Sequence, residues 1–141
     1  MAEAAARDVT LPELEREASQ LWSTLDAHAV IWLSGELGTG KTTFVQAIVR
    51  AAGARDPARS PTFALLHQYH TPSGEVYHAD CYRLKHPSEA IDLDLDAIAR
   101  DARAVLIEWP ERADGALPAP DVHLRFSHVS APARRRIERL R

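Results

Sequence analysis

The feature that most constrains the fold is a five-residue apolar run at positions 29–33 that leads directly into a glycine-rich loop. The run has the length of one strand and contains no polar residue, which predicts a strand covered on both faces. After the loop, apolar residues recur at helical spacing: Phe44, Val45, Ile48 and Val49. Strand, glycine-rich loop and helix in this order favour an α/β domain.

The loop matches the phosphate-binding pattern Gly-x-x-x-x-Gly-Lys-Thr at every fixed position. Its glycines allow backbone N–H groups to turn inward around phosphate oxygens, and the following helix directs its positive end at them. We expect Lys41 to contact the β- and γ-phosphates and the Thr42 hydroxyl to complete a Mg²⁺ shell. The alternative is a glycine turn beside a surface lysine. The residues expected to bind the nucleotide here are Gly35, Glu36, Leu37, Gly38, Thr39, Gly40, Lys41, Thr42 and Thr43.

Two acidic residues end other strand-like segments. A second wholly apolar run, residues 104–107, ends at Glu108, whose carboxylate could ligate Mg²⁺ directly, ligate it through water, or orient the attacking water. Asp80 also ends an expected strand, and could position water for attack on a γ-phosphate. The alternatives are a solvated carboxylate at Glu108, and an Asp80 that pairs with Arg83 or caps the next turn.

The rest of the chain predicts one three-layer α/β domain over residues 1–141. Thr10 and Glu13 form a capping box at the start of a helix whose apolar residues Leu11, Leu14, Leu21, Trp22 and Leu25 should face the core. The other expected elements are a hairpin of 62–69 and 76–80 turning at 71–74, a helix from 87 through 98, a loop at 110–120, and a half-exposed strand with Val122, Leu124 and Phe126 inward.

Composition narrows the class of protein. The net charge of −3 argues against a protein that binds nucleic acid over most of its surface. Cys81 is the only cysteine, which excludes an internal disulfide. The longest apolar run is too short to cross a bilayer and the first eight residues lack a signal pattern, so we expect a cytoplasmic protein without membrane contact. The chain has no asparagine for a guanine-binding Asn-Lys-x-Asp motif, which favours ATP over GTP.

Four short segments follow one another in a specific order. They are Gly-Glu-Leu-Gly-Thr-Gly-Lys-Thr-Thr from Gly35, Ser-Pro-Thr-Phe from Ser60, His-Ala-Asp-Cys-Tyr-Arg-Leu from His78, and Ile-Glu-Trp-Pro-Glu from Ile107. In order and spacing they resemble the TsaE (YjeE) family. The resemblance implies a P-loop NTPase fold with a mixed, mostly parallel central sheet. It also implies an ATPase needed for N6-threonylcarbamoyladenosine at position 37 of tRNA, which works with the TsaB–TsaD heterodimer and meets tRNA through that complex.

The resemblance also assigns roles by position. Lys41 and Thr42 would bind phosphate and Mg²⁺, Glu108 would be the second protein group on the metal, and Asp80 would serve hydrolysis. Lys41, Asp80 and Glu108 are thus the catalytic candidates. Thr62 would sense the γ-phosphate within a switch-like segment at 60–62, and Trp109 would pack beside the nucleotide. On the residues alone, Thr62 could simply begin a strand and Trp109 could be a core aromatic.

Two other functions remain open from the sequence: a small-molecule kinase and a nucleotide sensor that never hydrolyses ATP. The chain has no obvious arginine-rich lid insertion of the kind a kinase uses to exclude water, which favours transfer to water. Five of the last eight residues are arginines, which could meet tRNA phosphates or an acidic partner. The alternative is a solvated terminal strand with Ile137 and Leu140 inward. These arginines are Arg134, Arg135, Arg136, Arg139 and Arg141.

Overall fold

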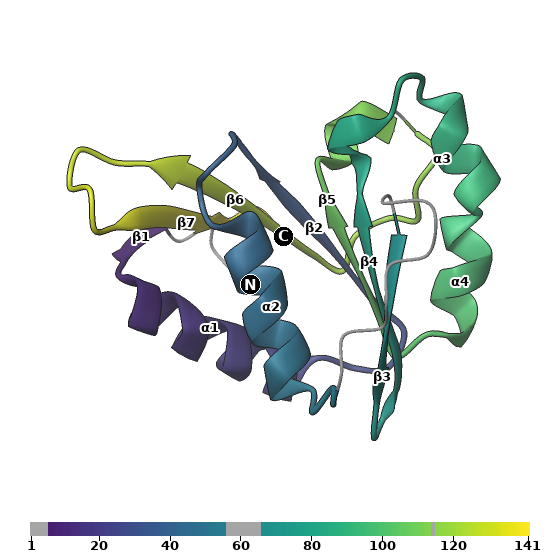
Figure 1. The fold of residues 1–141 in the computed structure, drawn as a ribbon, viewed down its shortest axis with the longest axis horizontal. Helices are drawn as coiled ribbons and strands as arrows, with labels where there is room; N and C mark the ends of the chain where they lie inside the picture. Colours follow the sequence, from purple (N-terminus) through teal and green to yellow (C-terminus); the bar gives the residue numbers. More distant parts are fainter. Residues whose placement is uncertain (1–5, 56–65, 114) are drawn as a thin grey trace.

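The structure, a computed structural model, describes residues 6–55, 66–113 and 115–141 (Figure 1). Strands and helices alternate through much of the chain. In order they are β1 (Ala6–Val9), α1 (Leu11–Thr24), β2 (Ala29–Gly35), α2 (Lys41–Ala51), β3 (Leu66–Thr71), β4 (Gly74–Asp80), η1 (Cys81–Arg83), α3 (Ser88–Leu93), α4 (Leu95–Asp101), β5 (Ala104–Glu108), η2 (Pro110–Ala113), β6 (Val122–His128) and β7 (Arg135–Arg139), where η marks a 3₁₀ helix.

The strands form one seven-stranded sheet in the order β1-β7-β6-β2-β5-β4-β3. Strands β6, β2, β5 and β4 are parallel neighbours, while β7 is antiparallel to both β6 and β1, and β3 is antiparallel to β4. Five of these seven described strands therefore run in one direction. The expected mixed, mostly parallel sheet is confirmed.

Helices cover both faces of the sheet, and each face has its own apolar core (Figure 1). Because side chains alternate along a strand, β2 contributes Ile31 and Leu33 to one face and Val30 to the other. The first core joins the sheet to α1 and α2, and the second joins it to α3 and α4. The structure thus has the three layers expected from the sequence.

The first helix begins as its capping box predicts. The Thr10 side chain accepts a hydrogen bond from the Glu13 N–H, and the Glu13 carboxylate accepts one from the Thr10 N–H at 2.8 Å. Leu14 is buried, and Leu21, Trp22 and Leu25 pack against the core. The prediction for Leu11 was wrong, because its side chain is 55% exposed. Leu11 lies in the first helical turn and lines a cleft instead of the core.

The expected hairpin and the expected helix from 87 to 98 have different outcomes. Strands β3 and β4 pair around a turn at 71–74, as predicted; the expected residues 62–65 lie outside the described ranges. The single helix was wrong, because α3 and α4 are separated at Asp94, which has a φ of +51°. Aspartate tolerates this left-handed conformation, and its Oδ1 accepts a hydrogen bond from the Ala97 N–H at the start of α4.

The C-terminal part follows the predicted pattern with two differences. Alternate residues of β6 are buried as expected, including Phe126. The 110–120 segment was predicted as loop throughout, but it begins with the 3₁₀ helix η2. Ile137 is buried, whereas Leu140 is 39% exposed because it follows the end of β7. Within the described ranges, none of the helices combines the length and apolarity needed to cross a membrane.

Candidate functional site

A cleft of about 600 Å³ opens where β2 passes into α2, beside the carboxyl ends of β4 and β5. The carboxyl ends of parallel strands are the usual place for ligands in α/β sheets. The cleft is lined by the loop after β2, the start of α1 and the segment before β7. Of the residues expected to bind the nucleotide or magnesium or to act in catalysis, the cleft is lined by Leu37, Gly38, Gly40, Lys41, Thr42, Thr43, Asp80, Glu108 and Trp109.

Lys41 is the most confined cation of the cleft. It is only 5% exposed, and its Nζ donates hydrogen bonds to the carbonyls of Gly35 at 2.5 Å and Glu36 at 2.8 Å. Burial lowers the pKa of Lys41, and the negative charges of Glu108, Asp80 and Glu111 oppose that shift. The lysine begins α2, so the ammonium group and the N-terminus of the helix face the same space.

Glu108 contacts two polar side chains at the floor of the cleft. The Thr42 hydroxyl donates to its carboxylate at 3.0 and 3.2 Å, and His78 Nε2 lies 2.6 Å from its Oε2. Burial alone would raise the pKa of Glu108, but the interactions with His78, Thr42 and Lys41 outweigh it and hold the pKa below its usual value. The site therefore contains an ionised carboxylate beside a hydroxyl.

Asp80 ends β4 directly beside Glu108, its partner in the parallel register of β4 and β5. The Asp80 Oδ1 accepts a hydrogen bond from the Tyr82 N–H at 3.0 Å, so this side chain caps the 3₁₀ helix η1. From the sequence, capping of the next turn was an alternative role for Asp80, and this cap is present. Asp80 also lines the cleft.

Trp109 lies between the cleft and the second core. It has a φ of +57°, and its N–H donates to the Leu33 carbonyl at 3.1 Å. The Lys41 Nζ lies 4.7 Å from the centroid of the indole ring. The centroids of the Tyr82 and Trp109 rings are 4.8 Å apart. Trp109 lines the cleft and also packs against the core beneath α3 and α4, so the core position considered from the sequence is present, while packing beside a nucleotide stays a prediction.

Comparison with known families shows what kind of protein carries this cleft. The family model described as "Threonylcarbamoyl adenosine biosynthesis protein TsaE" matches residues 10–137. The chain belongs to the TsaE family. The resemblance drawn from the four sequence segments is confirmed, and the family connects the chain with threonylcarbamoyladenosine biosynthesis.

Similar proteins carry the same family name. A tRNA threonylcarbamoyladenosine biosynthesis protein TsaE from Rickettsia bellii is 39% identical over 109 residues, which are 77% of this chain and 75% of that protein. One of the same name from Haemophilus influenzae is 33% identical over 93 residues, which are 66% of this chain and 59% of that protein. Among solved structures, Bacillus subtilis YdiB has the same fold, with a TM-score of 0.77 at 22% identity over 99% of this chain and 87% of YdiB.

Two sets of polar contacts were not predicted from the sequence, and only the first involves a residue that lines the cleft. One is His78 on Glu108. Residues two apart share a face of a strand, so the spacing of His78 and Asp80 was an available signal. The other is a cluster in which Ser34 donates to Glu111 and lies 2.8 Å from His123 Nε2. Burial lowers the pKa of His123. No local sequence pattern predicts this cluster, because its three residues come from separate elements.

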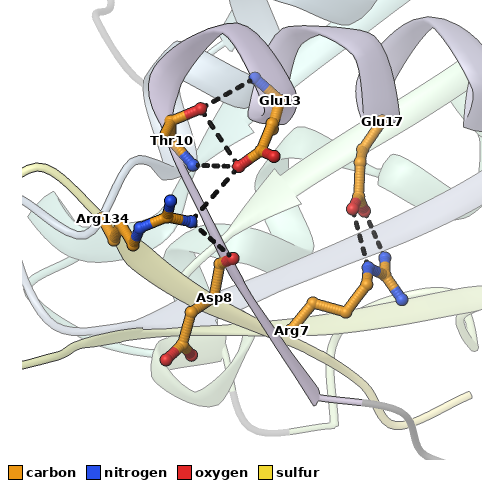
Figure 2. Close-up of polar contacts among 6 residues, drawn as sticks. All are labelled: Arg7, Asp8, Thr10, Glu13, Glu17 and Arg134. Atoms are coloured by element: carbon orange, nitrogen blue, oxygen red, sulfur yellow. Dashed lines mark hydrogen bonds and ion pairs between the residues drawn. The ribbon is translucent and has the colours of Figure 1, made fainter.

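The structure does not bring every predicted residue to the site. Thr62 and the segment at 60–63 lie outside the described residues. Most of the C-terminal arginines have partners within the chain: Arg134 contacts Asp8 and Glu13 (Figure 2), and Arg136 contacts Asp8. Further contacts join Arg139 to the Arg141 carbonyl and Arg135 to the Gly38 carbonyl.

Proposed function

We propose that this TsaE-family chain binds Mg-ATP in the cleft and hydrolyses it slowly in support of tRNA threonylcarbamoyladenosine modification, acting with the TsaB–TsaD heterodimer. The observation that carries the proposal is that Lys41 and Thr42, at the start of α2, line the same cleft as Glu108 at the end of β5, 66 residues after Thr42. A lysine, a hydroxyl and a carboxylate in this order are the groups that P-loop enzymes use for phosphate and magnesium.

The lining of the cleft combines groups suited to phosphate with apolar side chains, as a nucleotide requires. The loop and the N-terminus of α2 supply positive potential for phosphates. The cleft is also lined by apolar side chains, among them Leu11 and Leu37, which are 55% and 59% exposed. Exposed leucines at the rim of a cleft favour a flat apolar ligand group, and an adenine base is of this kind.

The donor atoms fit magnesium. Thr42 Oγ1 and the Glu108 carboxylate are both oxygen donors, which Mg²⁺ prefers. Among the described residues there is no group of three or more His, Cys, Asp or Glu side chains that could hold a metal ion. Phosphate and water would therefore complete the shell, with Thr42 and Glu108 as the protein contacts. When bound, magnesium neutralises charge on the β- and γ-phosphate oxygens.

The other side chains suggest how hydrolysis would proceed. Lys41 would exchange its two loop carbonyls for phosphate oxygens and stabilise the charge that develops during transfer. Asp80, which lines the cleft beside Glu108, would orient water for in-line attack. His78 would hold the Glu108 carboxylate in place. Trp109 would keep bulk water away from Lys41.

Phosphate release measures the proposal directly. We expect slow release from Mg-ATP by the purified protein, a changed rate when TsaB–TsaD and tRNA are added, and loss of release in Lys41→Ala and Asp80→Asn. Arg139→Gln, which changes a residue outside the cleft, should keep the wild-type rate. Phosphate appearing on a small-molecule acceptor would favour a kinase, and ATP binding with no release under any condition would favour a sensor.

A further inference from the structure

The β6–β7 hairpin contacts the outer side of the glycine-rich loop. Nε2 of His128 lies 3.0 Å from the Leu37 carbonyl oxygen, and Nε of Arg135 donates to the Gly38 carbonyl at 3.1 Å. His128 and Arg135 are direct partners in the register of β6 and β7. A single cross-strand pair therefore holds two consecutive peptide groups of the loop.

Holding these carbonyls fixes the direction of two N–H groups. In a trans peptide the C=O and the following N–H point in opposite directions, and the described residues contain no cis peptide bond. A hydrogen bond on the Leu37 carbonyl therefore orients the Gly38 N–H, and one on the Gly38 carbonyl orients the Thr39 N–H. N–H groups of this loop are the ones that would surround a phosphate.

The preceding two carbonyls of the loop are held from within it. The Gly35 carbonyl accepts from Lys41, and the Glu36 carbonyl accepts from Lys41 and from the Thr39 hydroxyl at 2.6 Å. If Lys41 moves to a phosphate, its bonds to these carbonyls are lost. The two bonds from the hairpin do not involve Lys41, so they can persist while a nucleotide is bound.

The hairpin is itself fixed to the N-terminal part of the chain. Arg134 donates to the Asp8 carbonyl at 3.4 Å and lies 3.5 Å from the Glu13 carboxylate (Figure 2). Arg136 donates to the Asp8 carboxylate at 2.8 Å. These side-chain contacts lie on either side of Arg135, whose backbone is held in the sheet by its pairing with Val9 of β1.

We propose that His128 and Arg135 are positioning residues, which hold the Gly38 and Thr39 N–H groups toward the phosphates of the nucleotide. This inference rests on the proposed ATP site, and it adds a contribution of the C-terminal hairpin to the affinity for the phosphate chain. His128 is the cleaner of the two to test, because it does not line the cleft and so does not alter the charge of the cleft wall.

The test measures binding of Mg-ATP and of tripolyphosphate by calorimetry. His128→Ala removes a donor, whereas His128→Gln keeps one. Arg135→Ala also removes a donor, and it is matched by Arg139→Ala, which removes the same charge from the same strand away from the loop. We expect His128→Ala and Arg135→Ala each to weaken both ligands about fivefold, the loss typical of one hydrogen bond. His128→Gln and Arg139→Ala should stay close to the wild type.

Amide NMR of the nucleotide-free protein gives a second measurement that requires no ligand. The Gly38 and Thr39 signals should shift in His128→Ala and Arg135→Ala and stay unchanged in Arg139→Ala. Wild-type affinities together with unshifted signals in both loop variants would overturn the positioning role while leaving the ATP site intact. If the wild type binds neither Mg-ATP nor tripolyphosphate, the proposed function is refuted, and the positioning role of His128 and Arg135 is refuted with it.

Discussion

Substitution of Gly35 by alanine should cost far more stability than an ordinary glycine replacement. Gly35 has a φ of +139° and pairs with Phe126 across β2 and β6. A Cβ at this position would lie 2.3 Å from the Phe126 carbonyl oxygen, so the backbones must separate by about 0.7 Å to reach 3.0 Å. The contact is with backbone, and no side-chain rotation can relieve it.

The cost has two parts. A non-glycine residue in this backbone conformation costs roughly 1–3 kcal/mol. Separation of the strands weakens the last hydrogen bond between β2 and β6, at about 1 kcal/mol. We therefore expect Gly35→Ala to lower the free energy of unfolding by roughly 3 kcal/mol. The matched control is Gly115→Ala, where φ is +81° and nothing lies within 4 Å of the added Cβ, so only about 1 kcal/mol should be lost.

Urea denaturation without nucleotide, followed by tryptophan fluorescence, measures both variants against the wild type. The comparison tests the contact with Phe126, because both glycines have positive φ and, of the two, only Gly35 would bring a Cβ against backbone. Equal losses at the two positions would refute the reasoning, since they would mean that β6 moves away from β2 at no cost.

Three further predictions concern single side chains. Glu108→Gln should remove the stabilisation that the ionised Glu108 carboxylate gives the folded protein. In the wild type this stabilisation is fully present above pH 4.5, the usual Glu pKa, and is lost as pH falls through the lower pKa of the folded state. The urea midpoints of the two proteins should therefore converge in acid. Thr10→Ala should cost about 1 kcal/mol in urea unfolding by removing the capping box, whereas exposed Thr24→Ala should change it by less than about 0.5 kcal/mol; equal losses would contradict the capping role. Burial raises the pKa of Cys81 to about 12, so the folded thiol should resist a thiol reagent at pH 8 and react on unfolding, and fast reaction of the folded protein would show that the site opens.

Local features of the fold were predictable because each is encoded within a few residues. The capping box at Thr10, the apolar run before Gly35 and the turn at 71–74 each combine a backbone preference with a hydrophobic pattern. The break at Asp94 was not predictable from spacing, because apolar residues continue on both sides of it at helical intervals. Leu11 was misplaced because periodicity shows which face of a helix is apolar, not where that face stops meeting the sheet.

The candidate site was predictable in its residue types and only partly in its contacts. The loop sequence named Lys41 and Thr42, and the end of an apolar run named Glu108. That Glu108 meets the Thr42 hydroxyl depends on the parallel pairing of β2 with β5, which no local pattern specifies. The contact of Arg135 with Gly38 joins residues 97 apart, and it follows only from the way the β6–β7 hairpin folds back on the loop.

The central claim is that Thr42 and Glu108 bring magnesium to a nucleotide held by Lys41. The most direct test is calorimetric titration of ATP with and without Mg²⁺ into the wild type, Glu108→Gln, Thr42→Val and Asp80→Asn. We expect Mg²⁺ to strengthen ATP binding in the wild type and in Asp80→Asn, and to have little effect in Glu108→Gln and Thr42→Val. An equal effect of Mg²⁺ in all four proteins, or an absence of ATP binding by the wild type, would contradict the account.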